Sequence, residues 1–496
     1  MEENFKIVFA KNLNKLGFNQ AINIPIDANA NVKSILDVNT YLFDVKVECG
    51  SGKAIITGKV GARVLYIDTD NITNSVSESA NFTETYVDAQ ITSTSYINIQ
   101  NHNVAYSVLD ASSTLKINCE VIISPVEYLN LNFAHNIEQN DNLITKKATL
   151  TTNTLSQFVN TSFEQVQVLE SSAPVNKILC VNSCFAAENV LAKDGYAVVD
   201  GKLCTTVLFE SNETIKELKQ ESAVKYDIEI ANLNKDELLD FSFMVDRSKT
   251  QIETELEENL SILTIKNQIL VCGAVLKTVE TSLVDDIYST TNVVTFNTSE
   301  RELTKHKETV TSTEVVTNEI SLSNNEPAID EIVCNLNPKA EITNTYIKDD
   351  QIYIEGVISS NLTYIDENKE FKHRELESPF IVNTKITASA FGCVNSSATV
   401  IDTRLKVKRG TIIDVESTLF VTTTVYVKES HTMVDGVTIG KALELNKYDF
   451  QIFLTKPNET TWDLCKRIKI SPDELNKLNK DLPAIMTGTE RVIIRR

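Results

Sequence analysis

Histidine is the first residue type to consider for catalysis or metal binding, because imidazole titrates near neutral pH and ligates metals. The sequence contains five histidines, and each stands alone among polar neighbours: His102, His135, His306, His373 and His431. No two of them are spaced to share one face of a helix. We therefore expect surface or structural roles for them, with no metal site and no histidine acting as a general base.

The cysteines would indicate zinc binding if they formed closely spaced pairs. Nine are scattered along the chain, and none forms a Cys-x-x-Cys pair. Cys180 and Cys184 are four residues apart, but no second Cys/His pair with zinc-site spacing accompanies them. The pattern is typical of small buried residues that stay reduced, which indicates a reducing compartment.

Motifs for phosphate binding and for serine hydrolysis are not found in the sequence. There is no Gly-x-x-x-x-Gly-Lys-Ser/Thr loop and no Gly-x-Ser-x-Gly elbow, and 14 glycines in 496 residues leave few turns that could cradle a phosphate. The acids Asp68, Glu210 and Asp366 lie in turn sequences, where we expect them to be solvated rather than to bind calcium. The sequence thus predicts neither an enzyme nor a cofactor.

The charge balance bears on partners and location. The chain has 47 Lys and Arg against 68 Asp and Glu, a net charge of −21, which argues against nucleic acid as a partner. Residues 446–496 differ, with ten basic residues against seven acidic ones. No apolar run is long enough to insert into a membrane, and the acidic start Met1-Glu2-Glu3-Asn4 is unlike a secretory signal. We expect a soluble cytoplasmic protein.

An internal repeat organises the first 430 residues. Its copies begin with Ile-Leu-Asp-Val-Asn at 35–39, Ile-Leu-Cys-Val-Asn at 178–182 and Ile-Val-Cys-Asn-Leu-Asn at 332–337. A glycine follows 23 or 24 residues after the first isoleucine, and an aromatic residue follows eight residues later: Gly58 and Tyr66, Gly201 and Phe209, Gly356 and Tyr364. The starts are 143 and 154 residues apart, so each copy is long enough to be a domain.

The repeat has the periodicity of β-strands. Apolar residues alternate with polar ones around each glycine, as at Ile352, Ile354 and Ile358. A spacing of eight keeps the glycine and the aromatic residue on one face, so we expect the ring to cover the glycine on its own bent strand or in a neighbouring copy. We predict three tandem all-β modules, sandwich-like or barrel-like, at 1–135, 136–290 and 291–440. The alternating segment 307–316 should be a leading strand of the third.

The pattern changes in the last fifty residues. A short alternating strand begins at 448, and a helical segment follows around Trp462. Ser471, Pro472 and Glu474 have the spacing of a capped second helix, in which Leu475 and Leu478 would be buried. A final strand follows Gly488, so 446–496 should be a small β-α-α-β domain. We expect Trp462, Leu464 and Ile468 to lie in its core.

These features resemble two known families. The three copies resemble the SPOCS (spore coat structural) domain. Segment 446–496 is similar to LysM through six matches, Thr460, Trp462, Leu475, Leu478, Asn479 and Gly488, although the usual Gly-Asp is Asn458-Glu459. The LysM resemblance implies a shallow ligand groove with Asn458, Glu459, Thr460 and Thr461 on one wall and Asn479, Leu482, Pro483, Ala484 and Ile485 on the other.

The domain order as a whole resembles clostridial spore-coat morphogenetic proteins. That resemblance implies a non-enzymatic scaffold in the mother-cell cytoplasm, at the forespore surface. There the LysM domain would dock onto the polymerising morphogenetic ATPase of the coat, and the chain would contact other coat proteins. The alternatives are a LysM protein that binds peptidoglycan or cortex, and a peptidoglycan hydrolase with a LysM tail.

Overall fold

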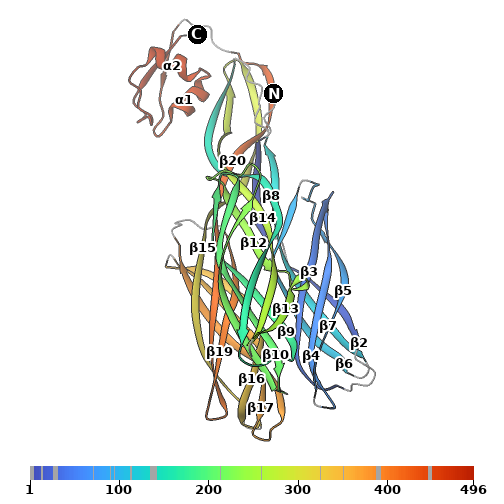
Figure 1. Ribbon diagram of the computed structural model, residues 1–496. Helices are drawn as coiled ribbons and strands as arrows, with labels where there is room; N and C mark the ends of the chain where they lie inside the picture. The colour runs from blue at the N-terminus through green and yellow to red at the C-terminus, as the bar shows by residue number, and fades with distance from the viewer. Residues whose placement is uncertain are drawn as a thin grey trace.

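The structure is a computed structural model of the 496-residue chain. It describes residues 5–12, 15–25, 32–70, 72–89, 91–93, 95–111, 114–133, 142–212, 214–257, 260–323, 326–349, 351–386, 393–444 and 450–495. The described chain is mainly β and contains several separate sheets, which confirms the predicted fold class at this level. Three groups of strands, followed by a small helical module, make up the molecule (Figure 1).

The first module, 5–133, consists of two sheets. One is the meander β3-β4-β5, and in the other the long strand β7 pairs with β1, β2 and β6. The strands are β1 (Phe5–Asn12), β2 (Leu16–Pro25), β3 (Val32–Gly50), β4 (Lys53–Asp68), β5 (Thr73–Val87), β6 (Tyr96–Ala111) and β7 (Thr114–Phe133).

The second module, 143–289, repeats this plan. The meander is β9-β10-β11, and β14 pairs with β8, β12 and β13 in the other sheet. The elements are β8 (Leu143–Ser171), β9 (Lys177–Lys193), β10 (Tyr196–Ser211), β11 (Thr214–Glu229), β12 (Leu238–Val245), the 3₁₀ turn η1 (Arg247–Lys249), β13 (Gln251–Glu257) and β14 (Leu260–Ser289).

The third module, 292–442, has the same order. The meander is β16-β17-β18, and β20 lies between β15 and β19. The strands are β15 (Asn292–Ser321), β16 (Ile329–Lys348), β17 (Gln351–Asp366), β18 (Phe371–Lys385), β19 (Cys393–Lys408) and β20 (Ile412–Ala442). The leading strand predicted at 307–316 is part of β15. The predicted boundary at 290/291 falls between β14 and β15, whereas those at 135/136 and 446 lie outside the described residues.

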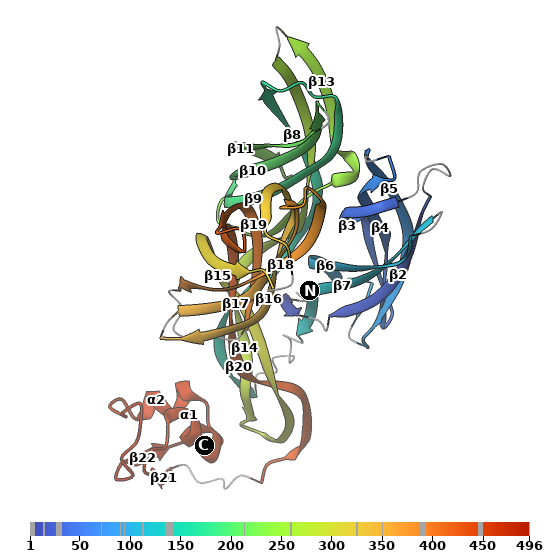
Figure 2. The ribbon, with the colours of Figure 1, turned by 90° about the horizontal axis from the view of Figure 1, so that it is seen from below.

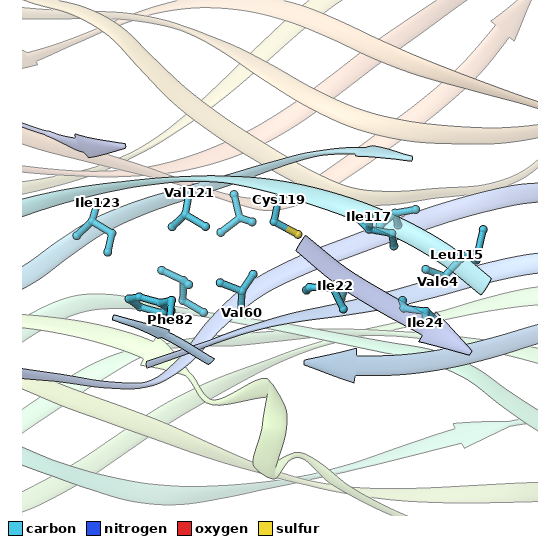
Figure 3. Close-up of a cluster of buried hydrophobic side chains, with 14 of the residues drawn as sticks. Ile22, Ile24, Val60, Val64, Phe82, Leu115, Ile117, Cys119, Val121 and Ile123 are labelled. Atoms are coloured by element: carbon cyan, nitrogen blue, oxygen red, sulfur yellow. The ribbon is translucent and has the colours of Figure 1, made fainter. Parts of the chain in front are cut away.

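Each module has a core between its two sheets, because residues of one face of the strands point inward. In the first module, Val60 and Val64 of β4 and Phe82 of β5 face Leu115, Ile117, Cys119, Val121 and Ile123 of β7 (Figure 3). Similar clusters of buried apolar residues lie between the sheets of the second and third modules. The modules are therefore β-sandwiches.

The repeat glycines allow an aromatic ring to approach, but the ring is not the one that the sequence suggested. A Cβ on Gly58 or Gly356 would lie within 3 Å of a ring from the next strand, that of Phe82 or Phe380. At Gly201 the nearest ring is that of Phe185, from the preceding strand. The prediction that the ring eight residues on covers the glycine is wrong. Eight residues span about 26 Å along a strand, whereas a cross-strand neighbour lies directly opposite.

The aromatic residues of the repeat, Tyr66, Phe209 and Tyr364, are all buried. The prediction that the acids after them are solvated is wrong for Asp68 and Asp366, which are also buried. Their carboxylates accept backbone N–H groups two and four residues ahead, which closes the turns after β4 and β17. A buried carboxylate is retained here because it satisfies turn donors that have no strand partner.

The C-terminal module packs at one end of the molecule. It comprises β21 (Gln451–Leu454), α1 (Thr461–Ile468), α2 (Pro472–Leu478) and β22 (Arg491–Ile494), and β21 pairs with β22. Two views place it beside the tip formed by β14 and β20, away from the first module (Figures 1 and 2). Neither helix in the described chain is long and apolar enough to cross a membrane.

Candidate functional site

Two capped helices position the loops of the C-terminal module. The side chain of Thr460 accepts the N–H of Asp463, whose carboxylate in turn accepts the N–H of Thr460. The same reciprocal cap joins Ser471 and Glu474, with Pro472 in the first turn of α2, which confirms the predicted helix start. Each cap satisfies N–H groups that a helix leaves unpaired at its first turn.

The structure brings the two predicted groove walls together. Thr460 forms an isolated bridge with Ile485. On the same stretch, the N–H of Met486 donates to the carbonyl of Glu459 at 2.8 Å, and the N–H of Asn458 donates to the carbonyl of Met486 at 2.9 Å. Segments about 25 residues apart in sequence thus lie side by side, held by backbone hydrogen bonds.

Two of the predicted contact residues have bonding roles inside the module. Glu459 is buried, and its carboxylate accepts hydrogen bonds from the guanidinium of Arg467 at 2.6 and 2.9 Å. The Arg467 hydrogen bond is the main reason that the pKa of Glu459 lies below its usual value. The Asn479 side-chain amide donates to the carbonyls of Leu475 and Ile493 and accepts the N–H of Ile493, so it joins α2 to β22.

The remaining groove residues differ in exposure. Thr461 and Leu482 are half-buried, and Leu482 packs against the core of the module. Asn458, Pro483, Ala484 and Ile485 are exposed. Ile485 has 62% of its surface accessible, and Asn458 adopts φ 62°, a left-handed conformation that asparagine tolerates. The surface available to a ligand at this place is therefore the loop 483–485 together with Asn458.

A second exposed apolar surface was not predicted. Ile452 and Leu454 project from β21, directly after the exposed Phe450, and Ile493 projects from the position on β22 that faces Ile452. The alternation was visible in the sequence, but the inward face was not, because one register step exchanges the two faces of a strand. Leu478 is also exposed, so its predicted burial is wrong; α2 buries only Leu475.

Helix α1 contacts β14 through the residue that the sequence assigned to the core of the module. Trp462 is half-buried, and its indole N–H donates to a carboxylate oxygen of Asp286 at 2.7 Å. The ammonium of Lys466 donates to both oxygens of Asp286, at 2.6 and 2.8 Å. The ring of Trp462 meets Tyr288 edge-on, and the Tyr288 hydroxyl donates to the carbonyl of Ile470 at 2.7 Å. The helix thus joins the module to the second sandwich.

The electrostatics of this contact centre on Asp286. Partial burial opposes ionisation of the carboxyl, but the hydrogen bonds from Lys466 and Trp462 outweigh it, so the pKa of Asp286 lies below its usual value. Burial raises the pKa of Tyr288, which keeps its hydroxyl protonated as a donor. The contact is therefore an ion pair with a directional indole bond beside packed rings.

The three repeat motifs meet at one place, which we call the junction. It is an apolar cluster to which every sandwich contributes: Leu36, Leu65, Ile67, Leu179, Cys180, Leu208, Cys334 and Leu336. Most of these residues belong to the motif strands β3, β9 and β16, and Leu36 with Leu179, and Cys180 with Cys334, are at equivalent positions of the repeat. The modules are therefore packed around a shared centre rather than strung out.

A buried polar network lies beside the apolar cluster. The last asparagine of each motif takes part in a chain, in which the Asn39 amide donates to Asn182 at 3.4 Å and the Asn182 amide donates to Asn337 at 2.9 Å. The Asn337 amide donates to one oxygen of Asp37 at 2.5 Å, and Asn361 donates to the other at 2.7 Å. The sequence shows an asparagine at the end of each motif, but its pattern does not indicate that the three copies bond to one another.

Two cations lie beside the network, Arg247 on η1 and Lys339 on β16. The Arg247 guanidinium on η1 donates to Asn39 at 2.7 Å, and the Lys339 ammonium donates to the carbonyl of Val104 at 3.2 Å. Burial raises the pKa of Asp37, lowers that of Arg247, and lowers that of Lys339 to about 8. The largest cause of each shift is the same, the cost of a charge away from water.

Among the described residues, no group of three or more His, Cys, Asp or Glu side chains is arranged to hold a metal ion. Comparison with known proteins returned no matching protein family, no matching curated protein and no matching solved structure. The candidate site is therefore defined by its own geometry, as the exposed loop 483–485 with Asn458 on the C-terminal module.

Proposed function

We propose that the chain is a non-enzymatic scaffold of the spore coat whose C-terminal module docks onto the polymerising morphogenetic ATPase. In this proposal the three sandwiches are SPOCS domains and the βααβ module is a LysM domain. The protein would act in the mother-cell cytoplasm, where it tethers coat components to the forespore surface. The resemblance of the repeats and of the last fifty residues to those families is the starting point.

The observation that carries the proposal is the exposed loop on a module that is itself fixed to a large body. Ile485 has 62% of its surface accessible, next to exposed Pro483 and Ala484, while Thr460 and Met486 hold the loop in place. A preformed apolar loop suits protein docking, because little ordering entropy is lost on binding. The junction also supports the proposal, because it packs the three sandwiches against one another and so gives the docking module a large body to which it is attached.

The test is co-sedimentation of the full chain with filaments of the morphogenetic ATPase and, separately, with purified peptidoglycan. The variant Ile485→Asp should weaken retention by the filaments about 30-fold, the effect of losing a contact worth about 2 kcal/mol. Val315→Asp is the matched control, because Val315 is also 62% exposed but lies on β15 of the third module.

Filament binding that survives Ile485→Asp would show that the loop is not the contact. In that case Ile452→Asp, on the outer face of β21, tests the second apolar surface of the module. Retention by peptidoglycan and not by filaments would contradict the scaffold proposal and favour the wall-binding alternative.

A further inference from the structure

Strands β9 and β10 place two cysteines directly opposite each other. Cys184 is the cross-strand partner of Cys204. Opposite residues of an antiparallel pair have Cα atoms about 4.5 or 5.5 Å apart, which lies within the range of about 4.4–6.8 Å found for disulfides. We propose that Cys184 and Cys204 form a thiol pair that closes to a cross-strand disulfide when the protein meets a small-molecule disulfide.

Among the described strand cysteines, only Cys184 and Cys204 have another cysteine as cross-strand partner. The strand neighbours of the remaining ones are other residue types, for example Leu208 opposite Cys180 and Thr363 opposite Cys334. Both cysteines of the pair are free and are half-buried as residues, whereas Cys180 and Cys334 are buried. Of the described strand cysteines, these two alone thus combine a thiol directly opposite with a partly exposed residue.

The surroundings favour Cys184 as the attacking thiol. A hydrogen bond from the Cys204 thiol is the main cause that lowers the pKa of Cys184, and the positive charge of Arg247 contributes in the same direction. The same hydrogen bond raises the pKa of Cys204. A thiolate is the nucleophile in disulfide exchange, so the reaction should begin at Cys184.

Formation of the disulfide needs an oxidant, and glutathione disulfide can act as that oxidant. The Cys184 thiolate attacks one sulfur of glutathione disulfide and releases a first glutathione thiolate. Cys204 then loses its proton and attacks the Cys184 sulfur of the mixed disulfide, which releases the second glutathione. Two protein thiols are oxidised to one disulfide, and one glutathione disulfide is reduced to two glutathiones.

The pair lies where the second sandwich touches the third. The Cys184 thiol donates to the carbonyl of Val400 on β19 at 3.5 Å, and the nearby Lys219 ammonium donates to the carbonyl of Thr403 at 3.0 Å. Disulfide formation removes the thiol proton, so the bond to Val400 is lost on oxidation. Oxidation of this site therefore also changes the contact between the two sandwiches.

The test is mass spectrometry of the native full chain after incubation with glutathione disulfide, alkylation of free thiols and trypsin digestion. The sequence places Cys204 in peptide 203–216, and Cys180 and Cys184 together in peptide 178–193. We expect these peptides to be joined by a disulfide in most of the molecules, and to separate on reduction. Cys180→Ser should keep the cross-link and Cys184→Ser should abolish it.

Two results would overturn the proposal. One is the absence of this cross-link from native protein when the same treatment joins the peptides in urea-unfolded protein. The other is a cross-link that survives Cys184→Ser and is lost in Cys180→Ser, which would assign the reactive thiol to the junction. Because neither result depends on coat proteins or on the loop 483–485, the test is independent of the proposed function.

Discussion

The contact between the C-terminal module and β14 can be tested by the fluorescence of Trp462. Trp462 is the only tryptophan in the sequence, and its indole donates to Asp286 at 2.7 Å. We predict that Asp286→Ala releases the module from β14 without unfolding it. The tryptophan emission should then move to longer wavelength, because the ring loses Tyr288 as a neighbour and becomes solvated.

The expected magnitude follows from the bonds lost. A hydrogen bond to a charged acceptor contributes about 1.5–3 kcal/mol, and the Lys466 bonds count for less because that side chain is 36% exposed. The total is about 2–4 kcal/mol, which shifts the ratio of docked to undocked module by roughly 30-fold to 900-fold. The pKa of Asp286 is lowered below 3.8, so its contribution is complete above that pH and is lost only as the pH falls through the lower value. Wild-type emission should therefore stay constant from neutral pH down to about 4.

The matched control is Asp285→Ala, which removes the same charge one residue away. Asp285 pairs with Lys146 rather than with the helix, so the emission should not change. Circular dichroism of each variant should match that of the wild type. An unchanged emission in Asp286→Ala, or an equal shift in Asp285→Ala, would refute the assigned contact.

Three further predictions concern the sandwiches and are all measured by urea unfolding of the full chain. Asp37→Ala leaves two buried amide donors without an acceptor and should cost about 2–5 kcal/mol, whereas Asp227→Ala on the exposed face of β11 should cost less than about 0.5 kcal/mol. Burial, with help from the nearby Arg247, lowers the pKa of Lys339 from 10.5 to about 8. The unfolded chain therefore binds more protons between pH 8 and pH 10.5, so the free energy of unfolding should rise by about 3 kcal/mol as the pH increases over that range. Lys339→Met should abolish that rise. Gly356→Ala would place a Cβ against the backbone carbonyl of Glu341 and should cost about 1–3 kcal/mol, whereas Gly17→Ala, with no atom within 4 Å, should be close to neutral.

Each of these predictions has an outcome that contradicts it. Equal losses in Asp37→Ala and Asp227→Ala would mean that the junction network contributes no stability. A pH dependence that persists in Lys339→Met would assign the titration to another group. Equal effects of the two glycine variants would show that the close approach at Gly356 is absent.

The repeat and the element types could be predicted from the sequence because they depend on local patterns. Alternation around each repeat glycine indicated strands, and the spacing of Ser471, Pro472 and Glu474 indicated a helix start. Both patterns act over a few residues, and every copy of the repeat shows the alternation, so no knowledge of distant contacts was needed.

The candidate site could be predicted only in part. The sequence, read through its resemblance to LysM, indicated both loops of the groove, and the structure joins them by backbone bonds between Asn458, Glu459 and Met486. The sequence did not show which side chains of the module remain exposed to a ligand. The burial of Glu459 depends on Arg467, and that of Trp462 depends on a strand almost 180 residues earlier.

The sequence by itself therefore determined what each segment is: three β copies and a β-α-α-β end. Only the tertiary structure determined which segments contact one another and through which residues. The ring over each glycine comes from an adjacent strand, the three motif asparagines bond at a shared centre, and the one tryptophan binds another module. The reason is physical: periodicity arises from neighbours along the chain, whereas packing and charge pairing depend on which surfaces meet after folding.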